Sequence, residues 1–155
     1  LNTDAEGRLI LADALSYAKK YNPELVIDFA TLTGSAVATI GHFGLVSMHK
    51  DSEKDHVSLK KAGDETHERL AELPFWSDYD ELIKSDIADI KNLGGSFGGA
   101  ITAGKFLAHF TDYPWIHVDM PGVYTKTKYG YRGKGATGMG VRLIYNFVKN
   151  RYKNG

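Results

Sequence analysis

The segment VIDFATL, residues 26–32, decides how this sequence is expected to fold. It is short, apolar and rich in β-branched side chains, and Pro23 and Gly34 bound it on either side. A run of this kind is typical of a buried strand whose two faces are both covered. The neighbouring parts of the chain should therefore supply helices that pack on a sheet.

Helices and strands alternate along the rest of the chain. Apolar side chains recur at helical spacing through residues 9–21, and Asn22-Pro23 ends that helix. The other expected helices are 36–40, 51–73, 78–84, 100–110 and 139–152, the other expected strands are 44–48, 87–90 and 115–120, and the expected loops are 92–99 and 122–138. This alternation predicts an α/β layered domain.

Composition narrows the classes of partner. A chain of 155 residues has the size of one domain. Its 19 Lys and Arg side chains balance 19 Asp and Glu side chains, so no net charge favours nucleic acid or an anionic membrane. Because it has no cysteine, a metal site would need carboxylate, imidazole or amine ligands. The most apolar stretch, residues 29–46, contains too many glycines and threonines for a membrane span.

Two glycine motifs are similar to nucleotide-binding loops but lack the required context. GKGATG, residues 133–138, matches the dinucleotide pattern, yet a long loop precedes it and no acidic residue follows Asp119. GAITAGKF, residues 99–106, is close to a Walker A motif, but Phe106 stands where a hydroxyl should hold magnesium. We expect a loop and a helix there rather than a nucleotide site.

A third motif, GGSFG at residues 94–98, has the form of a serine-hydrolase nucleophile elbow. Its triad would have to use Asp112 and His117 within a short segment, so a flexible glycine loop is the favoured interpretation. His117 and Asp119 alternate on an expected strand, where we predict a hydrogen-bonding role rather than metal ligation. Five further histidines show no ligand spacing and are expected at the surface or in packing: His42, His49, His56, His67 and His109.

The stretch NTDAEGRL, residues 2–9, has two interpretations. Thr3 and Glu6 have the spacing of a helix capping box. If residues 2–6 are instead extended, Asp4 and Glu6 project to one side, and a divalent cation would relieve the repulsion between their carboxylates. Spacing alone favours the cap and leaves the metal site open.

Residues 2–15, NTDAEGRLILADAL, closely resemble the signature of the leucyl aminopeptidase family, also called cytosol aminopeptidases, which are two-metal exopeptidases. Later family segments are resembled in the same order by VIDFATLTGSAVATIG, FWSDYDELIKSDIADIKN, GGAITAGKFLAHF, WIHVDMPG and KGATGMGVRLIYNF. The resemblance covers nearly the whole chain. It implies that residues 1–155 are the C-terminal portion of the catalytic domain, with α/β/α layers about a mixed central sheet.

The resemblance also implies roles for individual residues. Glu6 would bridge two divalent metal ions (Zn or Mn), Asp4 would bind one of them, and Arg8 would hold a bicarbonate or the transition-state oxyanion. Thr31 and Leu32 would contact the substrate through main-chain groups. The pocket for the N-terminal side chain would be bordered by Gly34.

The implied reaction releases a leucine-type N-terminal amino acid from a peptide by means of a metal-activated water. Family members also use two lysines and two aspartates upstream of the signature, outside this chain, so the 155 residues alone are expected to be inactive or nearly so. The resemblance further implies a cytoplasmic homo-hexamer in full-length form, with peptide substrates and without nucleic-acid or membrane partners. The alternative is a non-catalytic, aminopeptidase-related module for assembly or binding.

Overall fold

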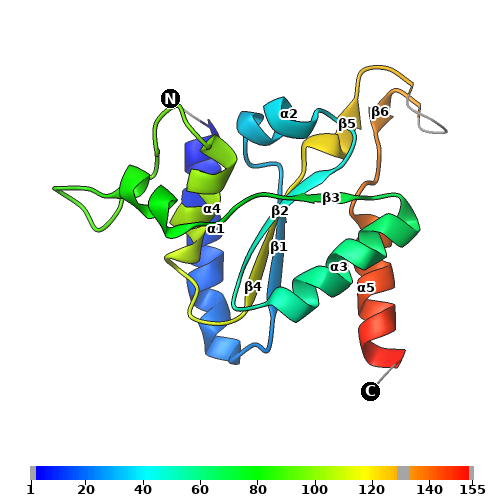
Figure 1. The fold of residues 1–155 in the computed structure, drawn as a ribbon, viewed down its shortest axis with the longest axis horizontal. Helices are drawn as coiled ribbons and strands as arrows, with labels where there is room; N and C mark the ends of the chain where they lie inside the picture. Colours follow the sequence, from blue (N-terminus) through cyan, green and yellow to red (C-terminus); the bar gives the residue numbers. More distant parts are fainter. Residues whose placement is uncertain (1–2, 129–132, 154–155) are drawn as a thin grey trace.

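A mixed four-stranded sheet forms the centre of the protein (Figure 1). The computed structural model describes residues 3–128 and 133–153. The strands lie in the order β1 (Val26–Ala30), β4 (Trp115–Asp119), β2 (Leu45–Lys50) and β3 (Leu70–Glu72). β1 is parallel to β4 and β3 is parallel to β2, while β2 runs antiparallel to β4. The mixed sheet implied by the resemblance is therefore confirmed.

Helices cover both faces of this sheet. α1 (Thr3–Ala18) and α4 (Gly99–Ala108) pack on one face, and α3 (Glu53–Thr66) and α5 (Val141–Lys153) pack on the other (Figure 1). Side chains along β4 alternate between the two layers, because successive strand residues point to opposite faces. Trp115 joins the core under α1 and α4, and Ile116 joins the core under α3 and α5.

Shorter elements connect these layers. They are η1 (Lys19–Tyr21), α2 (Gly34–Ile40), η2 (Ser77–Ile83), η3 (Pro121–Val123), and the antiparallel pair β5 (Tyr124–Thr125) and β6 (Gly135–Ala136). The expected loop over 122–138 thus contains two short strands, and its residues 129–132 lie outside the described part of the chain. Among the described residues, no helix has both the length and the apolar character needed to cross a bilayer.

The expected helix over 51–73 is wrong in its last third. α3 ends at Thr66, and His67 takes a left-handed conformation with φ of 60°. The chain then reverses, and Leu70 pairs with Leu45 in the sheet. Leu70 has helical spacing to Leu59 and Ala62, which misled the prediction. All three side chains are buried in the core under α3 and α5, but Leu70 enters it from β3 and not from the helix.

Residues 87–90 do not form the expected strand. They follow bends on the surface, and Ile87 is 98% exposed. The helix expected just before them is the 3-10 helix η2, which packs against α4. Ile90 packs at the edge of the core under α1 and α4, so its burial comes from that core and not from strand pairing.

Candidate active site

The signature residues lie at the start of α1. Because this helix begins at Thr3, Asp4 and Glu6 are helical and not extended. Residues two positions apart on a helix are rotated by roughly 200° about its axis, so the two carboxylates do not face each other. The extended arrangement is therefore wrong for this chain. Acidic residues in a first turn are favoured by the helix dipole, whereas the side chain of Thr3, on which the capping box depends, lies outside the described part.

Arg8 anchors α1 to the glycine-rich loop before α4. Its side chain is only 5% exposed, and its guanidinium donates a hydrogen bond to the carbonyl oxygen of Asn92. In return, the Asn92 side-chain amide donates to the carbonyl oxygen of Ala5 at 2.7 Å. The two bonds hold the loop against the first turns of the helix.

The guanidinium of Arg8 is buried and lies within the influence of two carboxylates. Burial lowers the pKa of its guanidinium, and Asp4 and Asp119 oppose that effect. Arginine nevertheless stays charged at neutral pH. Arg8 Nε and Asn92 Oδ1 are both buried without a hydrogen-bond partner. One hydrogen-bond donor of the Arg8 guanidinium is therefore unused in this structure.

Asp119, at the end of β4, holds the loop that follows β1. Its carboxylate accepts from the Leu32 amide at 3.1 Å, from the Thr33 amide at 3.4 Å and from the Thr33 hydroxyl at 2.7 Å. Burial raises the pKa of Asp119, although these hydrogen bonds and nearby His117 act to lower it. The loop is thereby fixed with Thr31 exposed and Leu32 buried. Gly34 is exposed as the first residue of α2.

His117 and Asp28 form a buried pair beneath this loop. His117 Nδ1 lies 2.6 Å from one carboxylate oxygen of Asp28, and Trp115 Nε1 donates to the other at 2.7 Å. Burial alone would lower the pKa of His117, but the carboxylate of Asp28 outweighs it and the pKa is raised. The hydrogen-bonding role predicted for His117 and Asp119 is confirmed.

The serine-hydrolase interpretation has no support in this geometry. Ser96 is exposed on the loop before α4, while His117 is fully buried and bonded to Asp28. The Walker-like segment forms α4, and part of the dinucleotide-like motif forms β6. The expectation of loops and a helix at these motifs is confirmed, with the addition of that short strand.

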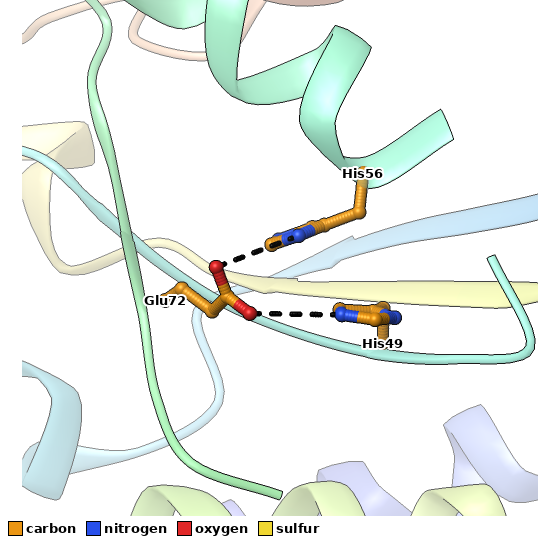
Figure 2. A group of neighbouring side chains, drawn as sticks. All are labelled: His49, His56 and Glu72. Carbon is orange, nitrogen blue, oxygen red and sulfur yellow. Dashed lines mark ion pairs between the residues drawn. The ribbon is translucent and has the colours of Figure 1, made fainter. Parts of the chain in front are cut away.

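The described residues contain a group of three possible metal ligands, but it is not the predicted one. His49, His56 and Glu72 each offer a ligand atom, and these atoms lie within 4.8 Å of one another (Figure 2). Asp4 and Glu6, on α1, do not form such a group. Metal binding by these two signature acids stays a prediction.

Comparison with known proteins places this geometry in a family. Residues 1–145 match the model of the cytosol aminopeptidase family, catalytic domain. The chain belongs to this family. A probable cytosol aminopeptidase from Chlorobaculum tepidum is 50% identical over 151 residues, which cover 96% of this chain but only 30% of that relative.

Solved structures share the fold. The bottromycin maturation enzyme BotP superposes with a TM-score of 0.91 at 30% identity, covering 97% of this chain and 34% of that one. The cytosol aminopeptidase from Coxiella burnetii gives a TM-score of 0.88 at 36% identity, covering 97% and 33% respectively. The chain thus spans about a third of the length of these two solved structures.

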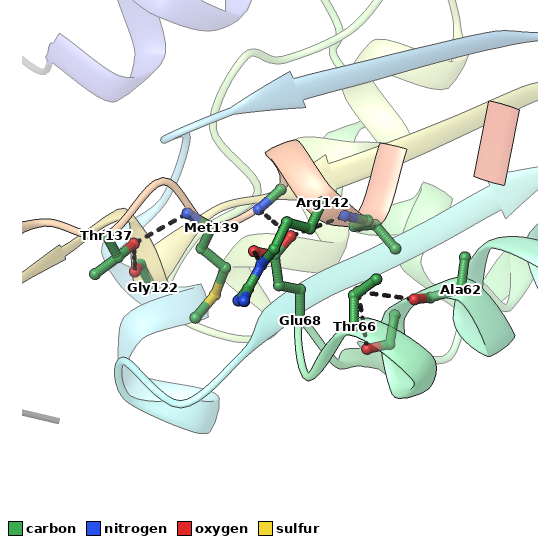
Figure 3. Close-up of polar contacts among 10 residues, drawn as sticks. Ala62, Thr66, Glu68, Gly122, Thr137, Met139 and Arg142 are labelled. Atoms are coloured by element: carbon green, nitrogen blue, oxygen red, sulfur yellow. Dashed lines mark hydrogen bonds and ion pairs between the residues drawn. The ribbon is translucent and has the colours of Figure 1, made fainter. Parts of the chain in front are cut away.

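Two polar contacts of this aminopeptidase domain could not be found from the sequence. One is the hydrogen bond from the side-chain amide of Asn92, in the glycine-rich loop before α4, to the carbonyl oxygen of Ala5 in α1. The other is Glu68, which is 1% exposed and accepts from the amides of Gly140 and Leu143 and from Arg142 Nε at the start of α5 (Figure 3). Asn92 ends the family-like segment FWSDYDELIKSDIADIKN, but that segment does not reveal its partner on α1, and Glu68 lies outside every quoted segment. Both residues act across long sequence separations.

Proposed function

We propose that the complete protein is an aminopeptidase that releases N-terminal amino acids, leucine among them, from peptides. The family match over residues 1–145 carries this proposal. The activity is proposed for the complete protein, because the chain spans only 30% of the Chlorobaculum relative. A cytoplasmic homo-hexamer acting on peptides belongs to the same proposal.

Within that enzyme, Arg8 would hold a bicarbonate or the developing oxyanion. Its burial, its permanent charge and its unbonded Nε support this role. The loop of Thr31, Leu32 and Gly34 would contact the substrate. Its position after the carboxyl end of β1 supports that role, since open α/β sheets usually bind ligands there.

Asp4 and Glu6 would bind two divalent metal ions, Zn or Mn, in the complete protein. In the present structure both belong to the first turn of α1 and point to different sides. Metal binding through both carboxylates therefore requires residues 3–6 to leave the helix.

A leucine anilide assay on the complete protein tests the role of Arg8. Replacing Arg8 with lysine keeps the charge but removes the planar, two-pronged donor set. We expect kcat to fall by about 100-fold or more, the cost of losing an oxyanion donor. The control is Lys20→Gln, which changes an exposed residue of η1, just after α1, and should keep the parental kcat. An Arg8→Lys enzyme with parental kcat would remove Arg8 from the mechanism.

The alternative, a non-catalytic module for assembly, is favoured by one observation. α5 exposes Val141, Tyr145 and Tyr152 on its surface, and a run of exposed apolar side chains is typical of a protein contact. Metal content separates the two functions. Two metal ions per complete subunit together with peptide hydrolysis would indicate the enzyme. A complete subunit that shows neither bound metal nor hydrolysis would indicate the module.

A further inference from the structure

Three potential metal ligands converge from three elements on the α3 side of the sheet (Figure 2). His49 extends from β2, His56 from α3 and Glu72 from the end of β3. His49 Nε2 lies 3.6 Å from Glu72 Oε1, and His56 Nδ1 lies 3.8 Å from Glu72 Oε2. The two imidazole rings are stacked with their centres 4.4 Å apart.

A buried hydroxyl group orients His56 for ligation. Ser47 Oγ lies 2.9 Å from His56 Nε2, and both side chains are fully buried. When the ring proton is on Nε2 and is donated to Ser47, the Nδ1 lone pair is free and points toward Glu72. Nδ1 is buried and makes no hydrogen bond. Metal-binding histidines are commonly held in this way by a partner on the other ring nitrogen.

The ligand types also suit a metal, because neutral imidazole and ionised carboxylate are the forms that bind a metal ion. A carboxylate beside two imidazoles is a set of ligands found at zinc sites with an open fourth position.

Two neighbours bear on this cluster in opposite ways. Glu53 Oε2 lies 3.1 Å from His49 Nε2 and is on an exposed side chain, so it is within reach as a fourth ligand. Lys60 Nζ lies 2.7 Å from Glu72 Oε2 and competes with a cation for that carboxylate. The Lys60 side chain is 39% exposed and can turn out into water.

We propose that His49, His56 and Glu72 bind one divalent zinc ion, with Glu53 or water as the fourth ligand. The ligands of a tetrahedral zinc ion are about 3.4 Å apart. The three ligand atoms lie within 4.8 Å of one another, so the side chains must draw closer together to bind the ion. The ion would tie β2, α3 and β3 together.

This site goes beyond the proposed aminopeptidase function. In β2, Val46 pairs with Asp119, whereas His49 pairs with Ile116 further along the antiparallel strand. The cluster therefore lies toward the end of the sheet opposite Asp119 and the loop after β1. It is also formed from residues that the signature does not include.

Calorimetric titration of the chelator-treated 155-residue chain with zinc chloride tests the site. We expect one zinc ion per chain, with affinity at least 10-fold weaker in both His49→Gln and Glu72→Gln. Lys60→Gln should bind zinc several-fold more tightly, because the competing ammonium is gone. The matched control is His67→Asn, an exposed histidine outside the cluster whose left-handed conformation asparagine tolerates.

A second readout does not depend on any substitution. Imidazole nitrogen NMR of the unaltered chain should show the His56 Nδ1 and His49 Nε2 signals shifting on addition of one equivalent of zinc, while that of His67 stays unchanged. The proposal is overturned if zinc leaves the His49 and His56 signals in place. It is equally overturned if His49→Gln and Glu72→Gln bind zinc as tightly as the unaltered chain.

Discussion

At the residue scale, buried carboxylates hold together parts of the chain that are far apart in sequence. Glu68 illustrates this, because its two oxygens accept from two backbone amides and one guanidinium at the start of α5 (Figure 3). A negative charge at a helix N-terminus also interacts favourably with the helix dipole. The charge of Glu68, and not only its shape, should therefore matter for stability.

Replacing Glu68 with glutamine tests that expectation. The substitution keeps the size of the side chain but turns one acceptor into a donor that faces other donors. We expect the free energy of unfolding to fall by about 2 to 3 kcal/mol, as measured by urea denaturation. Glu81→Gln, which disturbs only an exposed ion pair with Lys84, is the control and should stay within about 0.5 kcal/mol of the parent. Equal effects of the two substitutions would contradict the role given to Glu68.

His56 predicts a pH dependence of stability. Its pKa is about 4 in the folded protein, against 6.5 as its usual value. Between these two values the unfolded chain binds a proton that the folded chain does not, so stability falls as the pH is lowered. The loss should reach about 3 kcal/mol below pH 4.

Denaturation measured from pH 7 to pH 4 in the presence of a chelator checks this prediction. The groups that face His56 are His49, Glu72 and Lys60, and they contribute their own pH dependence. A His56→Gln variant should therefore lose the part of the slope that lies between pH 6.5 and pH 4. If the parent and the variant have the same slope, burial of a neutral His56 does not contribute.

At the element scale, the start of α2 depends on one side chain. Thr33 Oγ1 accepts from the Ala36 amide at 3.0 Å and donates to Asp119 at 2.7 Å, so it caps the helix and joins it to β4. We expect Thr33→Val to reduce the free energy of unfolding by about 1 to 2 kcal/mol. Thermal denaturation of both variants measures the effect. Thr39→Val, near the exposed end of the same helix, should be nearly neutral. A neutral Thr33→Val would show that the cap is dispensable.

β3 is an element that the spacing of apolar residues in the sequence wrongly predicts to be helical. Leu59, Ala62 and Leu70 share helical spacing and also share one core, but the chain reverses at His67 between them. Periodicity reports that a side chain is buried and does not report the direction from which it arrives. The pairing of Leu70 with Leu45, which is a long-range contact, decided the strand.

At the scale of the whole molecule, the 155-residue chain is predicted to be inactive on its own. The structure turns Asp4 and Glu6 to different sides of α1, and the chain spans only a third of a typical relative. Incubation of the purified chain with Zn or Mn and a leucine anilide should give no turnover above background. The complete protein, assayed in parallel, is the positive control. Turnover by the chain alone at a rate comparable to that control would contradict the prediction.

By itself, the sequence determined the family, the α/β class and most of the elements, because buried strands and amphipathic helices leave local patterns. Strand 26–30 and the helix of residues 99–108 are recognisable from those patterns alone. Tertiary structure alone decided the bond between Arg8 and Asn92 and the meeting of His49, His56 and Glu72. These features depend on contacts between residues far apart in the chain, and such contacts leave no periodic signal in sequence.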